Sequence, residues 1–205
     1  MVARDPRRGA LAFGPAVVQR LLAVRPPFLM VDRVDAVTFE PRPRALASRL
    51  LSANDPVFAA HFPQLAVLPG ALLTEGLGQV SGVLMALVML RRGYESRGLD
   101  PEALGAALRN LDRGFRLDPG YRPDTDGELA EALDPTRAPR VGFLASSQMK
   151  FIKPVFPGEV LGYELEHTRE LDALWHFTTR ATVGSTLVAE GTIVNALVEV
   201  PRLVR

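Results

Sequence analysis

Two side chains that can transfer protons, His61 and Glu75, lie 14 residues apart. We expect His61 in a loop and Glu75 near the start of an apolar helix. Apolar surroundings make a carboxyl group costly to ionise and raise its pKa, which suits a general acid near neutral pH. A neutral imidazole suits the opposite role of general base. The two residues are therefore either an acid/base pair, or a hydrogen-bonded core glutamate and a loop-anchoring histidine.

Other groups add to this candidate site or fall outside it. Gly70 begins the expected helix, where a free backbone N–H and the helix dipole would polarise a carbonyl oxygen. His167 and His176 lie in expected strands with no supporting group, so we do not expect them to be catalytic. No two histidines have the HxxxH or HExxH spacing of zinc sites, and the chain has no cysteine. We therefore predict no metal site and no cofactor.

The segment that carries Glu75 is long and apolar. Residues 69–90 contain a single charged residue, so the segment approaches the length of a membrane span. However, it carries Glu75, Gln79 and Ser81 and has no aromatic belt. A helix that is apolar all round is also typical of the central helix of a soluble protein. We favour that buried helix and expect no membrane span.

The order of apolar patterns predicts an α+β fold. Proline-terminated helical spacing, alternating segments and glycine turns mark the elements. We expect helices at 14–24 and 69–90, and strands at 28–39, 44–52, 141–153, 160–171, 173–184 and 186–199. Residues 91–140 form an insertion, with a short helix at 101–111 and an irregular remainder at 112–139. The chain is predicted to be a single domain, 1–205, with an antiparallel sheet wrapped around the long helix.

Composition excludes several classes of protein. The formal net charge is +1, which does not favour binding to nucleic acid. The absence of cysteine fits a reducing compartment. The N-terminal segment lacks the continuous apolar run of a secretory signal, so we expect a cytoplasmic protein.

Four segments in order resemble the β-hydroxyacyl-acyl-carrier-protein dehydratases of bacterial fatty-acid synthesis. The likeness extends over residues 14–90 and 141–200, and the interval from His61 to Glu75 matches the family's own. The four segments are RPPFLMVDRV (25–34), NDPVFAAHFP (54–63), VLPGALLTEGLGQ (67–79) and MKFIKPVFPGEVL (149–161).

The resemblance implies a hot-dog fold that dimerises, as a homodimer or a trimer of dimers, with its active site at the dimer interface. His61 of one subunit would remove the C2 proton of a (3R)-3-hydroxyacyl thioester. Glu75 of the other would protonate the departing hydroxyl, giving the trans-2-enoyl product. Gly70 N–H would hold the thioester oxygen, and Gln79 would orient Glu75 or a water. Glutamate rather than aspartate indicates a simple dehydratase that does not also isomerise the double bond.

The resemblance also implies a partner, an acyl-carrier protein that presents the acyl chain on phosphopantetheine. Because carrier proteins are acidic, we expect a basic rim around the site. Candidates for this rim are Arg91, Arg92, Arg140, Lys150 and Lys153. Phe58, Phe62 and Phe151 either line the acyl tunnel or belong to the core.

The chain departs from the family pattern at several positions. Ala60 and Gln64 replace glycines on either side of His-Phe-Pro, and Gly76 and Gly78 replace alanines. The insertion 91–140 is longer than the family's usual link. Fatty-acid and polyketide-type pathways therefore both remain open. Two other functions also remain open: an acyl thioesterase that uses a Glu75-activated water, and a non-catalytic partner subunit of a dehydratase complex.

Overall fold

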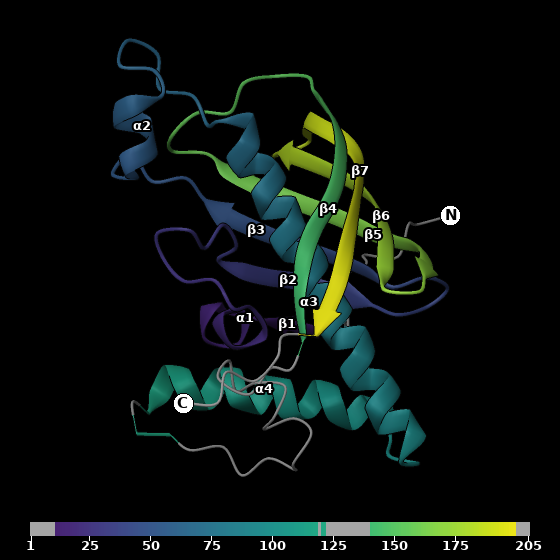
Figure 1. The fold of residues 1–205 in the computed structure, drawn as a ribbon. Helices are drawn as coiled ribbons and strands as arrows, with labels where there is room; N and C mark the ends of the chain where they lie inside the picture. The colour runs from purple at the N-terminus through teal and green to yellow at the C-terminus, as the bar shows by residue number, and fades with distance from the viewer. Residues whose placement is uncertain (1–10, 119, 122–139, 200–205) are drawn as a thin grey trace, which may run out of the picture.

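The computed structural model describes residues 11–118, 120–121 and 140–199. In this part of the chain, seven antiparallel strands form one sheet in the order β1-β2-β3-β5-β6-β7-β4. The sheet curves around one long helix (Figure 1). The strands are β1 (Leu11–Phe13), β2 (Arg33–Thr38), β3 (Arg44–Leu50), β4 (Arg140–Phe151), β5 (Val160–Leu171), β6 (Leu174–Val183) and β7 (Thr186–Glu199).

Alternation along the central strands separates the core from the outer face of the sheet. In β5, Tyr163 and Leu165 are buried, whereas Glu164 and Glu166 lie on the opposite face. Both glutamates pair with Arg44 of β3, at 2.8 and 3.3 Å. This period of two is what a strand with one covered face requires.

The long helix, α3 (Gly70–Ser96), fills the concave side of the sheet. Its length and composition would suit a membrane span, but 67% of its most apolar window is buried inside the protein. The predicted range 69–90 was too short at its C-terminal end. The helix continues because Tyr94 is buried and Arg91 pairs with Glu95 at 2.7 Å, and it ends just before Gly98, which has a φ of 69°.

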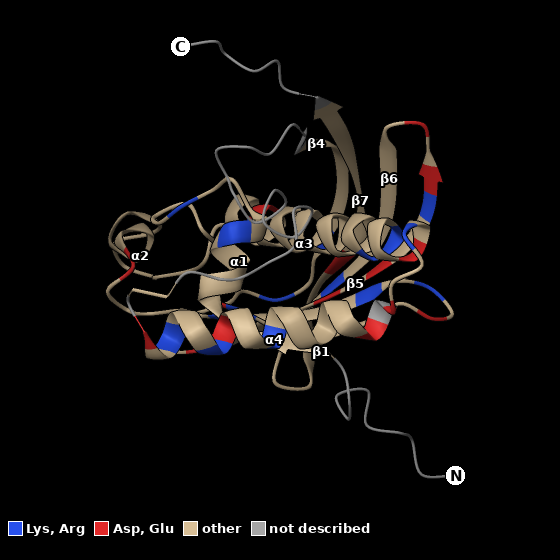
Figure 2. Ribbon diagram, turned by 90° about the horizontal axis from the view of Figure 1, so that it is seen from below, with Lys and Arg blue, Asp and Glu red and all other residues tan. Residues whose placement is uncertain are grey.

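The prediction for the insertion was wrong at residues 112–117, which are helical rather than irregular. Helix α4 runs over Pro101–Leu117, with Asp100 accepting a hydrogen bond from the Glu102 N–H at 2.9 Å. Its apolar stripe continues to Phe115, whose ring lies 3.3 Å below the Arg20 guanidinium. Figure 2 shows α4 alongside β1 and α1 (Pro15–Leu21). Residue 119 and residues 122–139 lie outside the described part of the chain.

Two further elements, the segment before β2 and a short helix, lie beside the N-terminal half of α3. The predicted strand 28–39 begins only at Arg33, because the Gln79 side chain binds the Met30 N–H and the Phe28 carbonyl in place of a neighbouring strand. The short helix α2 (Pro56–Ala60) lies near the first turn of α3, whereas α4 lies near its last turns (Figure 1).

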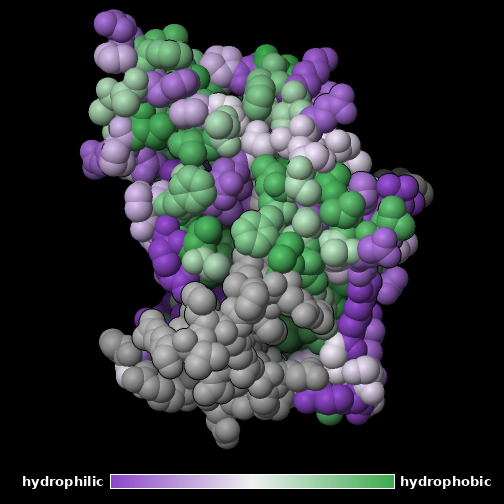
Figure 3. Space-filling model, viewed as in Figure 1, coloured by the Kyte–Doolittle hydropathy of each residue, from purple (hydrophilic) through white to green (hydrophobic). Residues whose placement is uncertain are grey.

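Strand β4 is an exposed edge of the sheet. It pairs with β7 on one side only, and residues 142–148 are exposed on both faces. Phe143 and Leu144 are 52% and 42% exposed. Hydrophobic side chains also gather on this face in Figure 3. A long hydrophobic edge strand is a template for pairing with another chain.

His167 is buried on the inner face of β5. Its ring lies 4.8 Å from that of Trp175 and 5.4 Å from that of Phe177. Burial lowers the pKa of His167. Glu170 opposes this shift, while Arg92 and His176 add to it.

We expect the free energy of unfolding to fall as pH drops below about 6.5, the ordinary pKa of histidine. In that range the unfolded chain binds a proton that the folded chain excludes, so acid favours unfolding. His167→Phe, which places a neutral ring between the same aromatic side chains, should reduce this dependence. Denaturant unfolding at several pH values between about 7.5 and 5.5 measures the free energy of unfolding. If this free energy falls equally with pH in both proteins, His167 is not the cause of the dependence.

Candidate active site

His61 is held in one tautomer at the end of α2. Its N–H donates to Val57 O at 2.9 Å, and its carbonyl accepts from Val67 N–H at 3.0 Å. The ring Nδ1 lies 2.9 Å from the Val67 carbonyl oxygen. A carbonyl can only accept, so Nδ1 carries the proton and Nε2 of the neutral ring is unprotonated. His61 therefore presents a base.

A pocket of about 520 Å³ opens beside this base. Gly70, the first residue of α3, contributes a backbone N–H for which no described group acts as acceptor. The Phe151 ring packs on Gly70 so closely that a Cβ there would lie 2.9 Å from the ring. The pocket is lined by His61, Val67, Leu68, Gly70, Leu73, Phe151, Ile152, Lys153, Pro154 and Val155. His61 and the first residue of α3 thus line one cavity.

Glu75 is oriented by Gln79, which is 5% exposed. The Gln79 amide donates to Glu75 Oε1 at 2.8 Å and to Phe28 O at 2.8 Å, and accepts from Met30 N–H at 2.7 Å. These three bonds fix which end of the amide faces Glu75. Gln79 therefore contacts the proposed acid directly.

Glu75 is not among the described residues that line the pocket at His61. Five residues separate Glu75 from Gly70, which turns its side chain about 140° around the helix from the pocket. Glu75 is also only half-buried here. The burial expected from the sequence is thus not reached within a single chain.

The three phenylalanine candidates lie in different environments. Phe151 lines the pocket. Phe62 stacks on the His61 ring at 4.1 Å and is 55% exposed. Phe58 is 5% exposed and belongs to the core, the second of the two alternatives for it.

The five predicted basic residues do not form one rim within a chain. Lys153 lines the pocket, and Lys150 is exposed nearby on β4. Arg91 and Arg92 follow Gly70 by 21 and 22 residues, which at about 1.5 Å per residue places them roughly 30 Å away. Arg92 also pairs with Glu170 at 2.8 Å. Arg140 begins β4, and its side chain lies outside the described residues.

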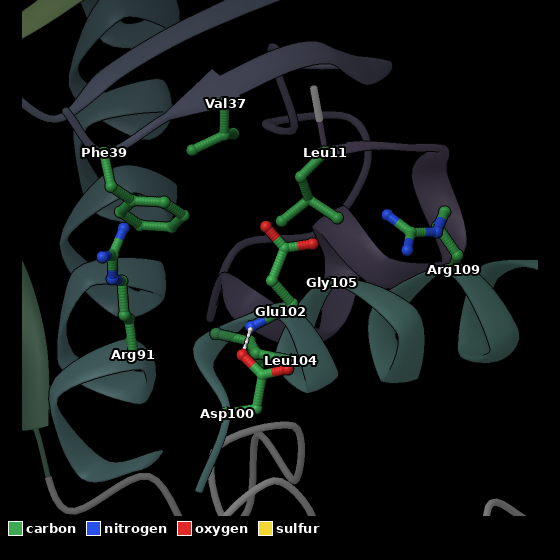
Figure 4. A pocket seen from close by; sticks show the side chains of 9 residues that line it. All are labelled: Leu11, Val37, Phe39, Arg91, Asp100, Glu102, Leu104, Gly105 and Arg109. Carbon is green, nitrogen blue, oxygen red and sulfur yellow. Dashed lines mark hydrogen bonds between the residues drawn. The ribbon is translucent and has the colours of Figure 1, made fainter. Parts of the chain in front are cut away.

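Arg91 borders a second concavity of about 330 Å³, between β2, the end of α3 and α4 (Figure 4). Its guanidinium lies 4.7 Å from the Phe39 ring and pairs with Glu95. Asp100 and Glu102 line the same concavity. Carboxylates therefore offset the positive charge of Arg91, and this surface is not a purely basic one.

The described residues contain no group of three His, Cys, Asp or Glu side chains that could hold a metal ion.

The structure adds residues that the sequence interpretation missed. The Val67 carbonyl selects the His61 tautomer, and no side-chain pattern signals that role. Arg49 is buried at 6% exposure. Its position was detectable, since it shares the inward parity of Ala45 and Ala47 in β3.

One departure from the family pattern has a structural cause. A Cβ on Gly76 would overlap the hydroxyl of Tyr163, which crosses from β5 to α3. Alanine at this position would therefore displace a buried side chain. A Cβ on Gly78 would meet no atom within 4 Å, so the space around this position does not explain the glycine.

An antiparallel sheet wrapped around one central helix defines a hot-dog fold. One chain of the dehydratase heterocomplex ApeI:P from Xenorhabdus doucetiae has the same fold, with a TM-score of 0.57 at 14% identity, covering 91% of this chain and 93% of that one. Residues 22–102 match the model of the FabA-like domain.

Sequence comparison identifies the family. The chain is 30% identical over 182 residues to the 3-hydroxyacyl-(acyl-carrier-protein) dehydratase FabZ of Anaeromyxobacter sp. (strain K), covering 89% of this chain and 88% of the relative. It is 29% identical over 184 residues to FabZ of Thiobacillus denitrificans, covering 90% and 97%. The chain belongs to the 3-hydroxyacyl-(acyl-carrier-protein) dehydratase family. The predicted family, fold and enzyme class, a dehydrating lyase, are confirmed.

Proposed function

We propose that this enzyme dehydrates 3-hydroxyacyl thioesters on acyl-carrier protein at a site completed by two subunits. One observation carries the two-subunit arrangement. His61 and Gly70 line one pocket, whereas Glu75 of the same chain is absent from its lining. A second copy would supply the missing acid.

The reaction follows from these positions. His61 Nε2 takes the C2 proton, and the negative charge that develops on the thioester oxygen accepts a hydrogen bond from Gly70 N–H. Protonated Glu75 of the other subunit gives its proton to the 3-hydroxyl. Water then leaves as the C2–C3 double bond forms. The product is a trans-2-enoyl thioester when the substrate is the (3R) epimer. Gln79 holds the carboxyl group of Glu75 in place throughout.

Two features support a homodimer, alone or as a trimer of dimers. Strand β4 has an unpaired edge with exposed Phe143 and Leu144. Glu75 is absent from the lining of the pocket that His61 and Gly70 share, so a second chain is needed to bring this acid to it. Pairing of β4 with the β4 strand of a second copy would give hydrogen-bond partners to the backbone groups of the free edge. It would also bring a second chain to the pocket wall at Phe151.

Lys150 and Lys153 support docking of the acidic carrier protein at the pocket mouth. Both belong to the segment that surrounds Phe151, so a phosphopantetheine arm bound there would lead straight to His61. We leave Arg91 and Arg92 out of this surface because of their distance and their carboxylate partners. The absence of cysteine fits a cytoplasmic enzyme of fatty-acid or polyketide-type synthesis.

Mass spectrometry of products from a panel of 3-hydroxyacyl thioesters, on carrier protein and on coenzyme A, tests the function. We expect loss of water with the thioester intact, and faster turnover on carrier protein. Release of free thiol without dehydration would indicate a thioesterase instead. Turnover only after addition of a second hot-dog chain would indicate a non-catalytic partner subunit.

A further inference from the structure

Arg49 is a buried cation that the reaction itself does not use. It lies on the inner face of β3, where Ala45 and Ala47 are also buried, and its side chain is 7% exposed. Burying a guanidinium is unfavourable unless it is paired and hydrogen-bonded. Its contacts therefore indicate what the charge holds in place.

The first contact of Arg49 is with the helix that ends at His61. Arg49 Nη2 donates to Asp55 Oδ2 at 2.9 Å. Asp55 is the N-cap residue of α2, yet its side chain makes no capping hydrogen bond to that helix. The carboxylate is turned to Arg49 instead. This ion pair joins α2 to the sheet, and the last turn of α2 holds the His61 N–H through Val57.

The second contact is with the segment that holds Gln79. Arg49 Nη1 contacts Met30 Sδ. The Met30 N–H donates to Gln79 Oε1, and its carbonyl accepts from the Tyr163 hydroxyl at 3.2 Å. Gln79 in turn donates to Glu75. The Arg49 guanidinium thus contacts two residues that lead to the proposed catalytic pair. Asp55 leads to His61, and Met30 leads through Gln79 to Glu75.

We infer that Arg49 is a positioning residue of the dehydratase, fixing α2 and His61 through Asp55. This inference rests on the proposed function for its kinetic consequences, but the contact between β3 and α2 stands apart from it. Displacement of a catalytic group by about 1 Å can cost about 10²-fold in rate. A displaced catalytic group lowers kcat more than it changes KM, whereas weaker substrate binding mainly raises KM.

The test compares Arg49→Met and Asp55→Asn with Arg44→Met. Arg44 lies on the same strand but faces outward, is half exposed and pairs with Glu164 and Glu166. Arg49→Met should lower kcat roughly 10- to 100-fold with little change in KM. Arg49→Lys should recover part of the loss, and Arg44→Met should match the wild type. The double variant Arg49→Met/Asp55→Asn should be no slower than the slower single variant, because both remove one interaction.

Hydrogen exchange read by mass spectrometry gives a second measurement that needs no activity. Amides of residues 57–61 should exchange faster in Arg49→Met and Asp55→Asn than in Arg44→Met. If Arg49→Met does not fold, Asp55→Asn carries both measurements, since Asp55 is partly exposed. Wild-type kcat in Asp55→Asn, or unchanged exchange at 57–61, would overturn the inference. Absence of dehydration by the wild-type enzyme would overturn the proposed function, and the exchange result would still decide the role of Arg49.

Discussion

His61→Gln and Glu75→Gln should each lower kcat for dehydration by roughly 10²- to 10⁴-fold, the usual range for loss of a general acid or base. Glutamine keeps the size and polarity of either side chain but can neither take the C2 proton nor deliver one to the hydroxyl. Product formation from a 3-hydroxyacyl thioester measures the loss, and circular dichroism and gel filtration check folding and assembly. Full activity in both variants would exclude the proposed chemistry.

Mixing the two inactive variants distinguishes a shared site from a site within one chain. In a mixed dimer, one of the two sites combines His61 from one subunit with Glu75 from the other, and the second site lacks both. Random exchange makes about half of the dimers mixed, so roughly a quarter of wild-type activity should return. Co-expression of differently tagged chains allows the mixed dimer to be isolated. If both residues of a site came from one chain, no mixture would recover activity.

Charging the edge of β4 should separate the subunits and abolish activity together. Phe143→Asp with Leu144→Asp replaces two exposed apolar side chains with carboxylates on the edge where the proposed dimer would pair, and charge on an edge strand opposes pairing by repulsion between the copies. The repulsion should yield a monomer by analytical ultracentrifugation. Its dehydration rate should be as low as that of Glu75→Gln, since each pocket would then lack its acid.

Leu171→Asp is the matched control, because Leu171 is 51% exposed on the same sheet but lies at the end of β5 rather than on β4. It should remain assembled and active. An active monomer carrying the β4 substitutions would show that one chain contains a complete site, and would leave the β4 edge without a role in catalysis.

Residue types and alternation were sufficient to predict the elements built from local patterns. The bounds of β5 and β7 agree with prediction because each strand begins just after a glycine turn, at Gly158 or Gly184, and buried residues alternate along most of β5. The predicted start of the strand at 28–39 was wrong for a non-local reason. Gln79, 49 residues from Met30, takes the hydrogen bonds that would have extended it. No pattern within the segment itself contains that information.

The sequence offers a hypothesis for the chemistry of the site but none for its geometry. The types of His61 and Glu75 and the resemblance around them indicated a base and an acid. The free Nε2 depends on a backbone carbonyl at Val67, which every residue type possesses. The separation of Glu75 from the pocket depends on where α3 begins, and a shift of one residue would turn it by about 100°. Such features follow from the folded backbone rather than from residue identity.

The orientation of Glu75 away from the pocket in its own chain has a consequence for how such enzymes diversify. On the proposed arrangement each chain gives its base to one centre and its acid to another. After gene duplication, one copy could lose His61 and the other Glu75, and the pair would still hold one working centre. Each copy would then be useless alone and under selection to keep its partner. A division of labour between unlike subunits can therefore arise by loss alone, without a new catalytic residue.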